Sequence, residues 1–223
     1  MRLQKAGIYT QIADGLNARR ALPDHPAIDG DRVAVAGFSL GGAAALYSMF
    51  EQAIGGLLGD DGPRFAAFAS FYAGCSFDFD DFRTSGGPVL LMMGEIDESM
   101  SIERCEWLQE KLVAHDVAAE LKVYEGAGHG WELPQSQAFQ PGLSVTKDCL
   151  MRWTADGRNV EQGSGRSVDS AVGAILAFSQ CSTREGYTMG RNEAAMEGSW
   201  RDFSAFLDSA FGRSDPAPDD QGP

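Results

Sequence analysis

The chain has 223 residues, and 18 Lys and Arg against 32 Asp and Glu give it a net charge of −14. Apolar residues make up 43% of the chain, and this length fits one α/β domain or two small ones. The acidic balance argues against nucleic acid and anionic membranes as partners, because phosphate binding needs clustered Lys and Arg. No apolar run reaches about 18 residues, and the N-terminus lacks a signal-peptide stretch, so we expect no membrane span and, by default, a cytoplasmic protein.

Strand-like and helical segments alternate through the first 124 residues. We expect helices at residues 9–21, 43–58 and 102–114, a turn-rich connector at 22–31, and strands at 32–37, 65–72, 88–93 and 120–124. The apolar sides of the first and third helices consist of Ile12, Leu16 and Ala21, and of Trp107, Leu108, Leu112 and Val113. Because helices separate the strands, the sequence predicts right-handed βαβ units, a parallel sheet and an α/β fold class.

The alternation stops at about residues 133–190, which we predict to be an insertion or cap. Residues 147–154 and 158–161 are expected to form a β-hairpin with its turn at Asp156-Gly157. A short helix is expected at residues 170–179. Two alternatives stay open for the insertion: a cap that shapes a substrate pocket, or a surface hairpin.

Near the C-terminus, Asn192 is expected to cap a helix. Its apolar residues recur at helical spacing: Met196, Trp200, Phe203, Phe206, Leu207 and Phe211. Residues 212–223 hold Pro, Asp and Gly with nothing to bury, and they are expected to be a disordered tail. Residues 1–211 are therefore expected to be a single domain.

The cysteines Cys75, Cys105, Cys149 and Cys181 are too few and too widely spaced for a zinc ribbon. Their number allows two disulfides. The pairs Cys149–Cys181, which flank one segment, and Cys75–Cys105 are the candidates, and whether either is formed stays open. The alternative is four reduced thiols, because the cellular compartment is unknown.

The candidate nucleophile is Ser39, in the G-x-S-x-G sequence of residues 37–41. The motif lies between a buried strand and a helix, and it is followed by Gly42 and three alanines. A nucleophilic serine needs such a tight turn, where small neighbours allow a strained backbone. The helix N-terminus then offers amide groups, that of Leu40 first, to a developing oxyanion. The alternative is a glycine-rich turn whose serine only caps the helix.

The chain has three histidines, and His129 is the candidate base. It follows the fourth predicted strand within GAGHGW, so its side chain can reach the crevice that holds Ser39. His25 lies in the connector and His115 near the end of a helix, and both are expected at the surface.

The orienting acid is expected in the loop after the third strand. Asp97 is our choice, with Glu95 and Glu98 as rivals. A buried carboxylate there would fix the imidazole tautomer and stabilise the imidazolium. The chain order Ser39, Asp97, His129 is the order of an α/β-hydrolase.

These residues carry a resemblance to a known family. GFSLGG, PVLLMMGEIDESMSIERCEWLQEKL and LKVYEGAGHGW together resemble the dienelactone hydrolase family of α/β-hydrolases, over about residues 8–131 and the helix near 192–211. The family nucleophile is often a cysteine. Ser39 stands there as in esterase-like members, so the resemblance implies a serine carboxylesterase acting on a small-molecule ester through an acyl-enzyme. It implies Asp97 and His129 as acid and base, and no metal or organic cofactor.

One departure from the family concerns the N-terminal side. Family members place several strands and an oxyanion loop before the nucleophile strand, whereas only 38 residues precede Ser39. We therefore expect the Leu40 amide as a single oxyanion donor, and a sheet that begins with an uncovered edge. The alternatives are a truncated longer enzyme, which could be periplasmic or secreted, or completion of the edge by the insertion or by a second subunit in a homo-oligomer.

Other hypotheses about function and substrate specificity stay open. A non-catalytic hydrolase-like remnant would explain the missing strands, and a peptidase or thioesterase would share the same triad. Trp131 and Phe38 are candidates for substrate contacts, with plain packing as the alternative for each. The acidic run at residues 78–81 lacks the spacing of a calcium loop and is expected to be a solvated turn.

Overall fold

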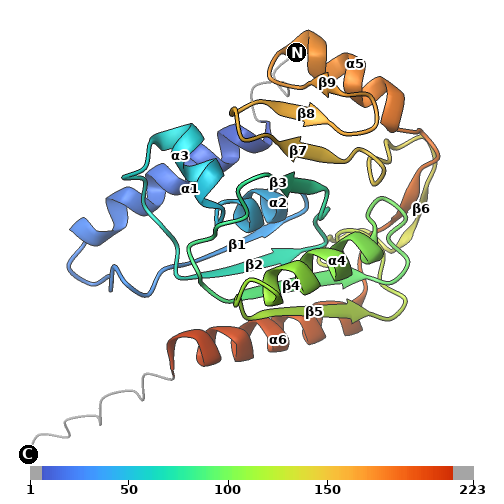
Figure 1. Ribbon diagram of the computed structural model, residues 1–223. Coiled ribbons are helices and arrows are strands. Elements are labelled where there is room, and N and C mark those ends of the chain that lie inside the picture. The colour runs from blue at the N-terminus through green and yellow to red at the C-terminus, as the bar shows by residue number, and fades with distance from the viewer. Residues whose placement is uncertain (1–6, 213–223) are drawn as a thin grey trace, which may run out of the picture.

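A four-stranded parallel sheet in the order β1-β2-β4-β5 lies at the centre of the computed structural model, which describes residues 7–212 (Figure 1). The elements of this part are α1 (Ile8–Ala21), the short 3-10 helix η2 (Leu22–Asp24), β1 (Ala34–Phe38), α2 (Leu40–Tyr47), α3 (Glu51–Leu58), β2 (Ala67–Phe71), β4 (Val89–Gly94), α4 (Ile102–Val113), β5 (Ala119–Tyr124) and α6 (Glu193–Phe211). The predicted parallel α/β architecture is confirmed.

The two central strands, β2 and β4, are buried along their whole length, which is why their sequences are almost continuously apolar. Phe68 and Leu91 point into the core that α2 and α4 cover. Phe71 and Met92 point to the other face, which α6 covers (Figure 1). In the described part of the chain β1 pairs only with β2, so the predicted uncovered edge is present.

The terminal helix α6 begins where it was predicted. The Asn192 side chain accepts a hydrogen bond from the Ala195 amide at 3.1 Å, which satisfies one of the free donors at the helix start. Met196, Phe203 and Phe206 pack on the sheet. The predicted tail, apart from Gly212, lies outside the described residues.

Three details of the predicted helices are wrong. The helix expected at 43–58 is divided into α2 and α3, because Phe50 is extended and its ring stacks on Phe79 with centroids 4.0 Å apart. Ala21 is exposed, and Val113 is 54% exposed, so neither belongs to its helix's apolar side.

The insertion builds a second sheet above the first (Figure 1). The elements of this part, with β3 from the preceding segment, are β3 (Phe77–Phe79), β6 (Ala138–Gln140), β7 (Met151–Trp153), β8 (Asn159–Glu161), β9 (Arg166–Ser167), α5 (Ala171–Cys181) and β10 (Tyr187–Met189). The second sheet has the strand order β3-β7-β8-β9, and β6 and β10 form a separate two-stranded sheet. The predicted hairpin is the antiparallel pair β7–β8, and the predicted short helix is α5.

The prediction of a solvated turn at residues 78–81 is wrong for the first half of this segment. Asp78 lies in β3, which runs parallel to β7, and its carboxylate pairs with Lys111 at 2.7 Å. The flanking Phe77 and Phe79 are buried in the core, so the acidic residues alternate with inward-facing rings. This period of two is typical of a strand.

Each of these two parts of the molecule holds one disulfide. Cys149–Cys181 links the segment before β7 to the end of α5, and Cys75–Cys105 links the segment after β2 to α4. Both pairings that the sequence left open are therefore formed. Among residues 7–212, no helix is long and apolar enough to cross a bilayer.

Candidate active site

Ser39 stands on a strained turn between β1 and α2. Its φ of 52° and ψ of −120° lie outside the regions that L-residues favour. A Cβ on Gly37 would lie 2.1 Å from the Gly41 carbonyl oxygen, so only glycine allows the turn to close so tightly. The Ser39 amide donates to the Phe71 carbonyl at 2.9 Å, which fixes the turn to the end of β2.

Three side chains from three loops meet at the carboxyl end of the sheet. The Nε2 atom of His129 lies 2.9 Å from Ser39 Oγ, and its Nδ1 atom lies 2.7 Å from Asp97 Oδ2. The Asp97 side chain is fully shielded from solvent, and that of His129 is 8% exposed. The structure therefore brings together the predicted nucleophile, base and acid in hydrogen-bonding order.

Ser99 completes the surroundings of the acid and was missed from the sequence. Its amide and hydroxyl donate to Asp97 Oδ1 at 3.0 and 2.5 Å, and its Oγ lies 3.4 Å from His129 Nδ1. One carboxylate oxygen thus faces Ser99 while the other faces the imidazole. The Asp-x-Ser spacing is the available signal, because Asp commonly accepts from the amide two residues later.

Two tyrosines that the sequence reasoning also missed flank the imidazole. The rings of Tyr72 and Tyr187 lie edge-on to His129, with centroids 4.8 and 5.4 Å away. Burial, together with hydrogen bonding to Glu132, raises the pKa of Tyr72. Burial, together with the charge of Asp97, raises the pKa of Tyr187. Both phenols therefore stay neutral at neutral pH.

The rival acids have other partners. Glu95 Oε2 accepts from the Gly126 amide at 2.8 Å, and Glu98 accepts from the amide and hydroxyl of Thr188 at 2.7 and 3.1 Å. Among the described contacts neither reaches His129. His25 and His115 are exposed, as predicted.

The two predicted substrate contacts lie elsewhere. Trp131 is 1% exposed, donates its indole N–H to Ser199 at 3.0 Å and packs between the sheet and α6. Phe38 stacks on Phe71 with centroids 4.5 Å apart, on the α6 side of the sheet. Neither lines the cavity at Ser39, so the structure favours the alternative of packing for both. Phe38 directly precedes Ser39 at the end of β1, but successive residues of a strand point to opposite faces, which misled the prediction for this residue.

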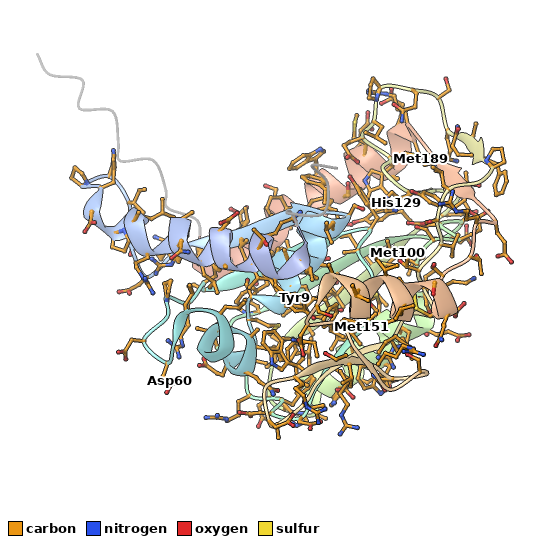
Figure 2. The ribbon with its side chains drawn as sticks, turned by 90° about the horizontal axis from the view of Figure 1, so that it is seen from above. Tyr9, Asp60, Met100, His129, Met151 and Met189 are labelled. Carbon is orange, nitrogen blue, oxygen red and sulfur yellow. A yellow bond between two sulfur atoms is a disulfide. The ribbon has the colours of Figure 1, made fainter. Side chains whose placement is uncertain are left out.

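A cavity of about 710 Å³ opens at Ser39 and His129. The start of α1, the start of α4 and the insertion enclose it. Seen from above, Tyr9, Met100 and Met151 lie around α5, with His129 beyond Met100 (Figure 2). Ala174 and Phe178 of α5 line the same space. Of the two alternatives for the insertion, the structure therefore favours the cap.

Residues 1–152, about two thirds of the chain, match the model of the dienelactone hydrolase family. The chain belongs to this family. The resemblance seen in its motifs is thus confirmed, and the parallel sheet with its helices is of the α/β-hydrolase type. No functionally curated protein matches the chain.

Several solved structures are similar. An esterase from the planctomycete Thermogutta terrifontis, with propionate bound, has 18% identity and a TM-score of 0.48, over 57% of this chain and 58% of that one. Arabidopsis thaliana SOBER1 F65L has 18% identity and a TM-score of 0.44, over 55% and 57%. Esterase PE8 has 20% identity and a TM-score of 0.40, over 56% of each chain. The chain spans a little over half the length of these proteins.

Proposed function

We propose that this member of a hydrolase family is a serine carboxylesterase that works through an acyl-enzyme. The observation that carries the proposal is the line of atoms from Ser39 Oγ through His129 to Asp97, with distances of 2.9 and 2.7 Å. A serine hydroxyl is a weak nucleophile until an adjacent base removes its proton, and the base must be held in one tautomer.

The proposed reaction has two halves. Ser39 Oγ attacks the ester carbonyl as His129 Nε2 takes the hydroxyl proton, and the imidazolium then gives that proton to the departing alkoxide. Water attacks the acyl-enzyme by the same route, and the acid product and free Ser39 are released. Asp97 stays ionised and stabilises the imidazolium in both halves.

The proposed oxyanion donor is the Leu40 amide. Leu40 is the first residue of α2, and the first amides of a helix have no acceptor within it. The positive end of the helix dipole also lies there. Removal of one such donor costs on the order of 10²–10³ in rate in enzymes where it is measured, so this single amide is an essential part of the proposal.

The proposed substrate is an ester with a bulky, mainly apolar portion. The cavity extends from Ser39 to the cap, where Met151, Val168, Ala174 and Phe178 lie on its wall. A space of about 710 Å³ is in the range of sites that enclose a drug-sized ligand.

Hydrolysis of p-nitrophenyl butyrate by the purified chain tests the proposal, beside Ser39→Ala. We expect turnover that falls to the background rate in the variant, while its circular dichroism and melting midpoint stay unchanged. Equal turnover in both proteins, or none from the folded chain, would overturn the assignment.

A further inference from the structure

The His129 loop is bonded to the far end of the insertion. The His129 amide donates to the Thr188 carbonyl of β10 at 2.8 Å, and the Gly190 amide donates to the His129 carbonyl at 3.0 Å. His129 and Met189 also form a parallel bridge and lie at the same end of the molecule (Figure 2). The main chain of the candidate base is thus held on both sides by β10.

The contact is close because residue 128 is glycine. A Cβ on Gly128 would lie 2.5 Å from the Thr188 carbonyl oxygen. Any other residue there would push β10 away from the loop. Gln137, which directly precedes β6, supports the same loop, because its side-chain oxygen accepts from the Gly128 amide at 2.8 Å.

Glu98 ties β10 to the loop that carries the acid. Its carboxylate accepts from the Thr188 amide at 2.7 Å and from the Thr188 hydroxyl at 3.1 Å. Glu98 directly follows Asp97 in sequence, and Thr188 bonds directly to the His129 amide. Thr188 therefore links the loop of the acid to the loop of the base.

We propose that Glu98 and Thr188 are positioning residues, which set the His129 imidazole against Ser39 by clamping its loop to the Asp97 loop. The inference rests on the proposed function, because it assigns a role toward the base of that reaction. Hydrogen bonds to a charged acceptor are about twice as strong as neutral ones, so this carboxylate is a firm anchor. Displacement of a catalytic group by 1 Å can cost about 10²-fold in rate, so a loosened clamp acts on kcat.

The test compares Glu98→Ala with Glu106→Ala, a matched removal of an exposed carboxylate on α4. We expect Glu98→Ala to lower kcat for p-nitrophenyl butyrate about 10-fold, with KM within about twofold, while Glu106→Ala has the kcat of the unmodified protein. Thr188→Val, which removes one of the two bonds, is expected to have a smaller effect and to add little to Glu98→Ala.

Hydrogen exchange supplies a readout that does not depend on turnover. In Glu98→Ala the amides of residues 128–131 are expected to exchange faster, with the rest of the sheet and the melting midpoint unchanged. Equal exchange and equal kcat in the Glu98 and Glu106 variants would overturn the clamp. A loss of kcat of about 10⁴-fold would also overturn it, since that is the scale for an orienting acid. Failure of the proposed function would give a different result from failure of the clamp. The chain without substitutions would then be inactive, or its activity would be unchanged by Ser39→Ala.

Discussion

Ser99 is the residue on which the orientation of Asp97 depends most directly. Its hydroxyl donates to Asp97 Oδ1 at 2.5 Å within a site where the carboxylate has no access to solvent. We expect Ser99→Ala to lower kcat about 10-fold, because a hydrogen bond to a charged group contributes about 1.5–3 kcal/mol.

Steady-state kinetics with p-nitrophenyl butyrate check this effect, and thermal unfolding of the same variant shows whether the fold is kept. An unchanged kcat in a folded Ser99→Ala protein would show that the backbone amide of Ser99 suffices to hold the acid.

The sequence could predict the three candidate catalytic residues, because each follows a strand and their order along the chain is distinctive. The sequence favours Asp97, but Glu95 and Glu98 stay rivals, since all three are carboxylates in one loop. Burial separates them: Asp97 is 5% exposed, and the two glutamates are exposed. Burial of a loop side chain depends on which other loops cover it, and a single sequence does not contain that information.

At the scale of elements, α5 contributes Ala171, Ala174 and Phe178 to the wall of the cavity. Ala174 lines the cavity, whereas Val172 on the same helix is 68% exposed and is not among the lining residues. We expect Ala174→Trp to shift preference from long-chain to short-chain p-nitrophenyl esters, because the added ring occupies the space of the acyl chain. Val172→Trp, the matched control, is expected to keep the original preference.

The measurement is kcat/KM for a series of chain lengths with both variants. An identical profile for Ala174→Trp would show that substrate does not reach the cap.

The hairpin β7–β8 carries a pH-dependent contribution to stability. Burial raises the pKa of Glu161, but hydrogen bonds from the Ser164 hydroxyl and from the Gly163 and Ser164 amides outweigh it and lower the pKa overall. A carboxylate with a lowered pKa stabilises the fold above its unfolded value of about 4.3, and loses this contribution as the pH falls through its folded pKa.

We therefore expect Glu161→Gln to lower the melting midpoint at about pH 7 and to have a smaller effect at about pH 3. Differential scanning calorimetry at both pH values measures the two differences. A difference that grows on acidification would contradict the assignment.

Sequence patterns indicate an element well when its partners are close along the chain. The hairpin β7–β8 and Asn192, the N-cap residue of α6, were predictable for this reason. The strand β3 was not, because three residues paired in parallel with a segment more than 70 residues away leave only a weak alternation. The same holds for the break at Phe50, which depends on the ring of Phe79.

At the scale of the whole molecule, each layer has its own disulfide: Cys149–Cys181 lies within the cap, and Cys75–Cys105 lies within the part built on the parallel sheet. Cys149–Cys181 closes a loop across a sequence separation of 32 residues, and α5 ends at Cys181. We expect Cys149→Ser with Cys181→Ser to reduce the free energy of unfolding by about 2–4 kcal/mol. Urea denaturation of the oxidised chain and of the double variant checks the value, and equal midpoints would contradict it.

The arrangement of layers follows from the sequence for the sheet but not for the insertion. Alternating strands and helices predict the parallel sheet, which the described residues show. The insertion holds short strands that pair with distant segments and with the His129 loop. Its position over Ser39 therefore depends on contacts that no local pattern encodes.

Covalent labelling tests the central claim, that Ser39 is a nucleophile activated by His129. The chain is incubated with a fluorophosphonate, and the adduct is measured by intact mass and located by peptide mapping. We predict one adduct per chain at Ser39, no adduct in Ser39→Ala, and labelling slowed by about 10³-fold or more in His129→Ala. An adduct at another residue, or an unlabelled Ser39 in a chain that hydrolyses esters, would contradict the account.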